Sequence, residues 1–168
     1  MGASPLNKRA RLALTAILTA YGLFLLLHPQ HYGFLDSLDL AIHESGHLVF
    51  GPFGEFVGFL GGTPMQLIIP SVFVAYFIRR RDRHAATVAL WWIAQNLWNI
   101  SVYIGDARAQ ELPLVGGGEH DWTYLLDTLN LLEKDVSIGH AVHLLGVVLF
   151  VLSVIWGVTT AGDEPAER

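Results

Sequence analysis

The chain has 168 residues, of which 52% are hydrophobic and 15% are charged, and its formal net charge is −5. Soluble domains carry about a quarter charged residues, so this composition excludes an ordinary soluble domain and favours a membrane protein. The acidic balance argues against nucleic acid as a partner. Because the sequence contains no cysteine, thiolate sites are excluded, and any metal must bind histidine and carboxylate side chains.

Four apolar runs predict helices that cross a bilayer. The predicted crossings are residues 12–27, 65–78, 85–104 and 136–158. A crossing needs about 20 residues, so the shorter runs require help from their flanks. The first run follows basic residues, but no small-residue cleavage site comes after it, so we expect a retained anchor rather than a cleaved signal peptide.

Lysine and arginine predict the orientation of these crossings. Basic residues cluster before the first run, at 8–11, and between the second and third runs, at 79–83. By the positive-inside rule both clusters face the cytoplasm. The segment 105–135 carries two basic and seven acidic residues and belongs outside. We therefore expect both termini in the cytoplasm and a location in a bacterial inner (cytoplasmic) membrane.

A shorter helical pattern at 36–50 lies between the first two crossings. The first crossing ends on the outer side and the second starts there, so both ends of this shorter helix must lie on the outer side. We expect a re-entrant helix that returns through irregular, glycine-rich backbone at 51–64, which membranes tolerate only inside protein or beside a wet cavity. The resulting fold class is an all-α integral membrane protein with about four transmembrane helices, the re-entrant helix and a short outer interfacial helix at 123–133. Residues 1–160 form one membrane-embedded domain, and the polar tail 161–168 is predicted to be disordered.

The re-entrant helix contains the sequence His43-Glu44-Ser45-Gly46-His47. Histidines four residues apart lie on one face of a helix, so both can bind a single zinc ion, while the glutamate can act as general base toward a water at the metal. Ionisable groups inside a membrane segment are costly and mark functional sites. Asp39, one turn earlier, is placed either to accept a proton from the second nitrogen of His43 or to cap the helix start.

The run from Asp36 to Pro70, with this HExxH motif at its centre, resembles the zinc-binding segment of site-2-protease-type intramembrane metallopeptidases. The resemblance implies that His43 and His47 are zinc ligands and that Glu44 activates water for peptide hydrolysis. In that family the third ligand is an aspartate of a Leu-Asp-Gly motif on a later helix, and this chain has no such triplet.

A catalytic zinc site requires a third protein ligand. Two candidates rank first: Asp106, at the outer end of the third crossing, and His120, in a loop after three glycines with Asp121 beside it to orient the ring. His140 and His143, one turn apart on the last helix, are candidates for the same ion or for a second one. His84, among cytoplasmic arginines, is expected to be a solvated loop residue.

Further polar side chains follow one face of the third crossing. Asn96 and Asn99 lie on this face, below Asp106, and are candidates either to bind a substrate backbone or to hydrogen-bond between helices. A polar face of this kind must meet protein or a wet cavity rather than lipid.

The leading functional hypothesis is a membrane-embedded zinc metallohydrolase, most simply a metallopeptidase, in which Glu44 is the general base. The same residues also suit a zinc-dependent hydrolase of lipid amides or esters. Two further alternatives are a di-iron membrane oxidase and a non-enzymatic metal-binding protein. The expected partners are the lipid bilayer and a membrane protein, peptide or lipid substrate, and small bundles of this kind often associate as homo-oligomers.

Overall fold

The computed structural model describes residues 7–114 and 118–163, and all regular elements in these ranges are helical. This confirms the predicted all-α class. The elements are α1 (Lys8–Leu27), α2 (Phe34–Phe50), the 3-10 turn η1 (Gly51–Phe53), α3 (Glu55–Arg79), α4 (Arg83–Gly105), α5 (Asp121–Thr128), the 3-10 turn η3 (Leu132–Lys134) and α6 (Asp135–Thr160).

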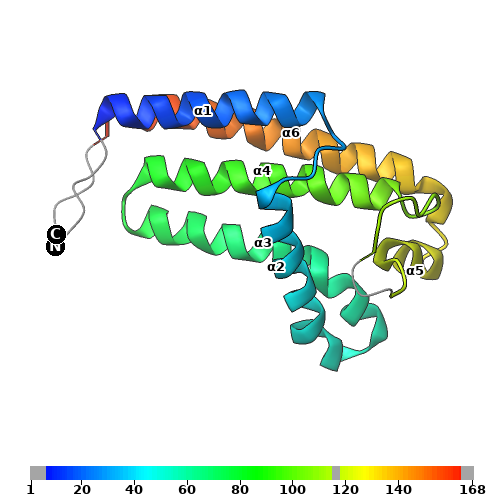
Figure 1. Cartoon of the computed structure of the whole chain (residues 1–168). Coiled ribbons are helices and arrows are strands. Elements are labelled where there is room, and N and C mark those ends of the chain that lie inside the picture. Colours follow the sequence, from blue (N-terminus) through cyan, green and yellow to red (C-terminus); the bar gives the residue numbers. More distant parts are fainter. Residues whose placement is uncertain (1–6, 115–117, 164–168) are drawn as a thin grey trace.

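The long helices form a bundle in which α1, α4, α6 and the second half of α3 lie alongside one another (Figure 1). The starts of α1 and α4 and the ends of α3 and α6 all lie at one end of the bundle. At this end Arg11 of α1 lies 3.7 Å from Asp82, just before α4, and donates a hydrogen bond to the backbone oxygen of Asp163, after α6. The two basic clusters of the sequence therefore share one end of the molecule.

Three helices in the described part of the chain are long and apolar enough to cross a membrane, namely α1, α3 and the segment Leu132–Thr160 that contains α6. The predicted crossing at 85–104 corresponds to α4, which is long enough but more polar. Thirteen of the 23 residues of α4 are buried, compared with seven of 26 in α6. The position of α4 at the centre of the bundle lets it carry polar side chains that meet protein.

The outward face of α6 consists of exposed apolar side chains that recur at helical spacing. This stripe comprises Leu144, Leu145, Val148, Val151, Leu152 and Ile155, each with 47% or more of its surface exposed. A contiguous apolar face of this length is typical of contact with lipid rather than with water. The opposite face carries Gly139 and Gly146, which allow α6 to approach the backbone of α4 closely.

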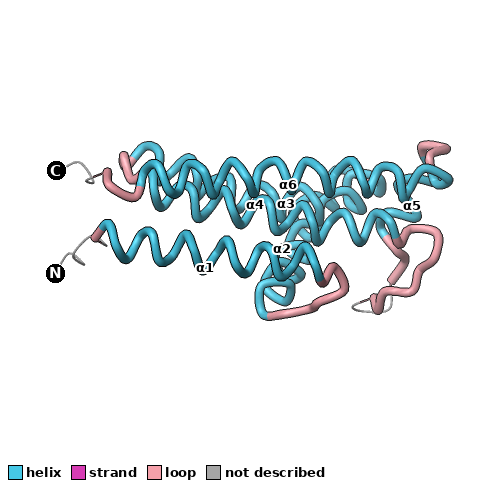
Figure 2. The backbone as a smooth tube through the Cα atoms, turned by 90° about the horizontal axis from the view of Figure 1, so that it is seen from above, coloured by secondary structure: helices cyan, strands magenta, loops and turns pink. Residues whose placement is uncertain are grey.

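Helix α2 and the first half of α3 form a hairpin that projects from the side of the bundle (Figure 1), whereas Figure 2 shows α1 running alongside α4 and α6. The two helices cross where Gly46 faces Gly61, and a Cβ atom on Gly46 would lie only 2.3 Å from the Gly61 oxygen. Prolines 64 and 70 lie inside α3, which changes direction between its two halves.

The expectation of irregular backbone throughout 51–64 is wrong. Only the turn at Gly51–Gly54 is non-α, with Gly54 at a φ of 108°, and residues from Glu55 onward already belong to α3. The glycines serve the close helix crossing instead of interrupting the helix. The outer helix also differs from its predicted range, since α5 ends at Thr128 and a separate turn, η3, follows.

His84 is buried rather than solvated. It is the second residue of α4, and its Nε2 atom lies 3.1 Å from both the Thr15 hydroxyl and the Arg11 carbonyl oxygen of α1. Of the predicted tail, residues 161–163 are described and Ala161 is buried, whereas 164–168 lie outside the described residues. The expected glycine loop at 116–118 is likewise described only at Gly118.

Candidate metal centre

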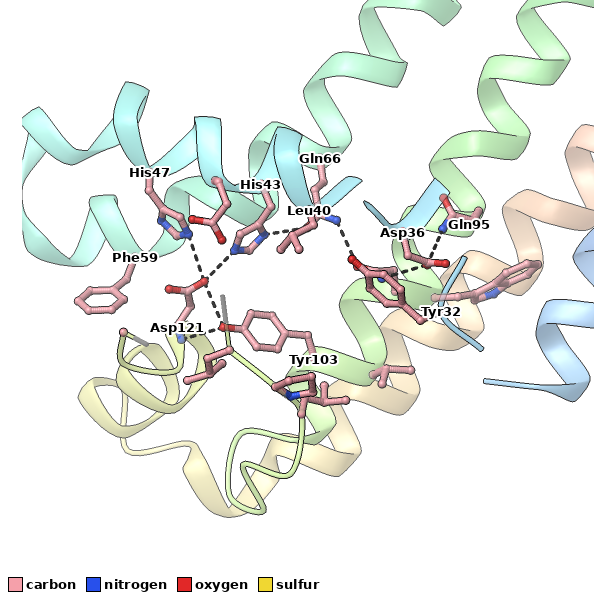
Figure 3. Close-up of a pocket in the computed structure, with 18 of the residues that line it drawn as sticks. Tyr32, Asp36, Leu40, His43, His47, Phe59, Gln66, Gln95, Tyr103 and Asp121 are labelled. Atoms are coloured by element: carbon pink, nitrogen blue, oxygen red, sulfur yellow. Dashed lines mark hydrogen bonds and ion pairs between the residues drawn. The ribbon is translucent and has the colours of Figure 1, made fainter. Parts of the chain in front are cut away.

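Three side chains converge at the end of the bundle opposite the basic clusters. They are His43 and His47 of α2 and Asp121, the first residue of α5 (Figure 3). The Asp121 Oδ2 atom lies 2.8 Å from His43 Nε2 and 3.3 Å from His47 Nε2. In the described part of the chain, this is the one group of three histidine or acidic residues whose ligand atoms all lie within 4.8 Å of one another.

The other ring nitrogen of each histidine is held by α3. His43 Nδ1 lies 2.9 Å from Gln66 Oε1, and His47 Nδ1 lies 2.8 Å from the backbone oxygen of Gly58. Both partners are oxygens that accept, so each Nδ1 carries the proton and donates. In a neutral ring each Nε2 then keeps a lone pair that faces Asp121 Oδ2, and a histidine whose second nitrogen donates to a fixed acceptor is characteristic of metal ligands.

The two separations from Asp121 Oδ2 are close to those expected around one zinc ion, and the three ligand atoms all lie within 4.8 Å of one another. Ligands bound at about 2.0–2.1 Å with tetrahedral angles lie roughly 3.3–3.4 Å apart. The two distances to Asp121 Oδ2, 2.8 and 3.3 Å, are at or slightly below that range, so small shifts would let all three atoms share an ion. Two imidazoles and one carboxylate are also a donor set that zinc prefers.

The close crossing of α2 and α3 makes room for this arrangement. A Cβ atom on Gly62 would lie only 2.4 Å from the ring of His43, so only glycine at this position accommodates the ring. His43 is 6% exposed, whereas His47 is half-buried and faces a cleft. The glycines of α3 thus explain why two adjacent turns of α2 can point their histidines inward.

A cleft of about 1000 Å³ opens beside the three side chains. His43, His47 and Asp121 line it together with Glu44, whose side chain is exposed and forms no hydrogen bond or ion pair with another described residue. Further walls come from the α1–α2 connection, from Leu40 of α2, Phe59 of α3 and Val102 of α4, and from the segment that precedes α5, including Leu112 and Leu114. The cleft gives a ligand access to the metal centre along a largely apolar surface.

Tyr103 of α4 supports Asp121 from the side away from the histidines (Figure 3). Its hydroxyl donates to Asp121 Oδ2 at 3.4 Å and accepts from the Asp121 backbone nitrogen at 3.2 Å. The ring of Tyr103 also packs against the His43 ring, with centroids 5.8 Å apart. This contact ties the start of α5 to α4 and holds the carboxylate toward α2.

The two residues ranked first for the third ligand lie together in a neighbouring contact. His120 Nε2 is 3.5 Å from Asp106 Oδ2, and neither side chain belongs to the group of three. The Asp106 oxygens accept hydrogen bonds from the backbone nitrogens of Glu111 and Leu112, and His120 Nδ1 accepts from Thr123 N at the start of α5. Both therefore hold described parts of the connection between α4 and α5 in place.

The remaining predicted residues lie at different distances from the centre. Asp39 does not bond His43; its Oδ1 atom accepts from Trp92 Nε1 instead. Asn96 and Asn99 both contact Gln66. His143 lines the cleft, with Nδ1 3.5 Å from the Ser101 hydroxyl, whereas His140 is exposed.

Sequence reasoning assigned Asp121 the role of orienting His120 and did not single out Gln66 or Gly58. Asp121 lies in the acidic segment 105–135, just before the helix predicted at 123–133. Nothing in the sequence indicates which of the adjacent residues 120 and 121 turns toward α2. Gln66 carried a weaker signal, as a single amide within an apolar run.

Comparisons of the chain with protein-family models, with curated proteins and with solved structures gave no significant match.

Proposed function

We propose that this protein is a membrane-embedded zinc-dependent hydrolase, most simply a metallopeptidase, with its metal centre at His43, His47 and Asp121. The single observation that carries the proposal is the convergence of two imidazole Nε2 atoms on one carboxylate oxygen while both Nδ1 atoms donate to α3. A proton on one Nε2 atom would bridge only that nitrogen and the carboxylate oxygen, whereas one zinc ion would bind all three atoms at once.

The residues of the chain have distinct roles in this proposal. His43, His47 and Asp121 would hold the zinc ion, which supplies a Lewis acid that polarises a carbonyl group and activates water. Glu44, on the cleft side of α2, would take a proton from the attacking water and pass it to the leaving amine. Tyr103 holds the carboxylate ligand in position.

We further propose that α4 is a fourth crossing and that the α2–α3 hairpin is inserted in the membrane. Length supports the first point, since α4 has 23 residues, about 35 Å at roughly 1.5 Å each. Exposed apolar side chains support the second, because Leu48 is 83% exposed and Phe53 is 72% exposed at the tip of the hairpin. With both basic clusters on the cytoplasmic side of a bacterial inner membrane, the metal centre lies toward the outer face.

A hydrolase of lipid amides or esters is the second candidate. The apolar walls of the cleft favour a substrate that comes from the bilayer, whether a peptide segment or a lipid. Zinc chemistry acts on either carbonyl, so substrate profiling separates the two.

The test uses the purified full-length chain in detergent. Metal analysis should find one zinc per chain, and hydrolysis should be measured on transmembrane peptides and on lipid amides and esters. We expect Glu44→Gln to retain zinc and to lose hydrolysis by about 10²–10⁴-fold, because the proton acceptor is removed.

Glu111→Gln provides the matched control, since Glu111 is an exposed acidic residue at the same end of the molecule and does not line the cleft. It should retain both zinc and activity. Undiminished turnover in Glu44→Gln would exclude Glu44 as the base. Two equivalents of iron per chain would favour the di-iron oxidase, and a chain that binds zinc but hydrolyses neither substrate class would favour a non-enzymatic metal-binding protein.

A further inference from the structure

A buried chain of hydrogen-bonded side chains connects His43 to two carboxylates in the first turns of α2. Asp39 is fully buried, and its Oδ1 atom accepts from Asn96 Nδ2 at 3.2 Å as well as from Trp92 Nε1 at 2.9 Å. Asp36 Oδ1 accepts from Asn99 Nδ2 at 3.3 Å. Because a carboxylate oxygen accepts and does not donate, both asparagines must turn their NH₂ groups toward α2.

The orientation of the asparagines determines that of Gln66. An amide whose NH₂ group faces one neighbour presents its carbonyl oxygen to the other side, and here both carbonyl oxygens face Gln66. Gln66 Nε2 donates to Asn96 Oδ1 at 3.3 Å and to Asn99 Oδ1 at 3.2 Å. Gln66 is 3% exposed, so water cannot replace these bonds.

Gln66 in turn determines which nitrogen of His43 carries the proton. With its NH₂ group committed to the asparagines, Gln66 presents Oε1 to His43 Nδ1 at 2.9 Å. Reversing this amide would put its oxygen against two asparagine oxygens. The hydrogen bonds through Asn96 start from Asp39, and those through Asn99 start from Asp36. Both series favour the same orientation of the Gln66 amide (Figure 3 shows Gln66 and Asp36).

We propose that Asp36 and Asp39 act through Asn96, Asn99 and Gln66 as positioning residues that hold His43 in the tautomer with Nδ1–H and a free Nε2. This inference rests on the proposed metal centre and deepens it, since it assigns the polar face of α4 to the preparation of a metal ligand. None of these side chains need touch the metal or the reacting atoms.

The experiment compares single and double variants for zinc affinity, measured by competition with a chromogenic chelator. Gln66→Leu removes the acceptor for His43 and should weaken binding by about 10–100-fold. Asn99→Leu changes a half-buried residue that does not contact His43 and should weaken binding by about tenfold. Ser101→Ala, a buried hydroxyl of the same helix that bonds Trp98 O outside the chain of amides, is the matched control and should bind zinc normally.

The double variant tests whether Asn99 acts through Gln66. If it does, adding Asn99→Leu to Gln66→Leu should cause no further loss, whereas general loosening of the bundle would add a second loss. If either leucine variant fails to fold, Asp39→Asn and Asp39→Leu test the positioning role instead. Asparagine keeps an acceptor oxygen for Asn96, so Asp39→Asn should lose less zinc affinity than Asp39→Leu.

Nuclear magnetic resonance of isotope-labelled histidine provides a readout that does not depend on metal. In the metal-free protein His43 should carry its proton on Nδ1, and Asn99→Leu, in which only Asn96 still holds the Gln66 amide, should raise the fraction of rings with the proton on Nε2. Wild-type affinity and an unchanged tautomer in Asn99→Leu would overturn the inference while leaving the metal centre intact. A wild-type chain that binds no zinc, with His43 still protonated on Nδ1, would reject the metal centre and retain the positioning role.

Discussion

Two contacts between histidine and aspartate lie near one another at the same end of this molecule, and they differ in what they can bind. In the first, His43 and His47 donate from Nδ1 and turn both Nε2 atoms toward Asp121. In the second, His120 Nδ1 accepts from the backbone of α5, so its proton must lie on Nε2, which faces Asp106 at 3.5 Å. A protonated nitrogen cannot bind a metal.

The position of the proton, rather than residue type or burial, therefore distinguishes the proposed metal site from the structural contact. His120 is as buried as His43, and burial lowers its pKa, which keeps the ring neutral with a single proton. Once that proton is on Nε2, the ring caps the start of α5, and its Nε2–H faces the Asp106 carboxylate at 3.5 Å without forming a hydrogen bond. The predictions below test this comparison.

The largest contrast should come from the histidines themselves. His43→Ala removes a proposed ligand and should lower zinc affinity by more than about a hundredfold. This loss should exceed the loss expected when a residue that hydrogen-bonds a ligand is replaced. His120→Ala should retain zinc and lower the free energy of unfolding by about 1 kcal/mol, because the cap of α5 is lost. Zinc titration and thermal unfolding in the same detergent measure both effects. Loss of zinc in His120→Ala would show that the second contact belongs to the metal centre.

Substitution of Asp121 should lower zinc affinity, whereas substitution of Asp106 should lower only stability. Asp121→Asn replaces a charged ligand by a neutral one and should weaken zinc binding by at least about tenfold. Asp106→Asn leaves one oxygen for two backbone nitrogens and should cost about 1 kcal/mol of stability without changing zinc affinity. Equal zinc affinities in the two variants would reject the assignment of Asp121.

Tyr103 lies between the two contacts and should show the smallest effect. Tyr103→Phe keeps the ring that packs on His120, with centroids 4.2 Å apart, but removes the hydroxyl that donates to Asp121. The net loss of one such hydrogen bond is about 1 kcal/mol, so zinc affinity should fall by about fivefold. Unfolding temperature and zinc affinity should be measured together, and a fall in stability alone would limit Tyr103 to a structural role.

Much of the fold could be predicted from the sequence because apolar runs and basic flanks are local properties. The helical class and the helix of the HExxH motif followed from them, and α2 begins only two residues before its predicted start. The glycine-rich segment after the motif was predicted incorrectly, because glycine at a helix crossing and glycine in a loop have the same local composition. Only the partner helix shows that Gly61 and Gly62 serve close packing.

The polar face of α4 was visible as a periodic pattern, but its partners were not. Whether Asn96 and Asn99 face a substrate or another helix depends on where Gln66 lies, 30 and 33 residues away in the chain. Hydrogen-bond direction is then set by the carboxylates at the far end. No local pattern contains that information.

By itself the sequence determined the long apolar runs, the helical periodicity and the spacing that puts two imidazoles on one face of a helix, since these depend on neighbours within a few residues. The choice of Asp121 over its neighbour His120 was decided by the tertiary structure alone. It follows from the way α5 begins, which turns one side chain toward α2 and uses the other to satisfy a backbone nitrogen.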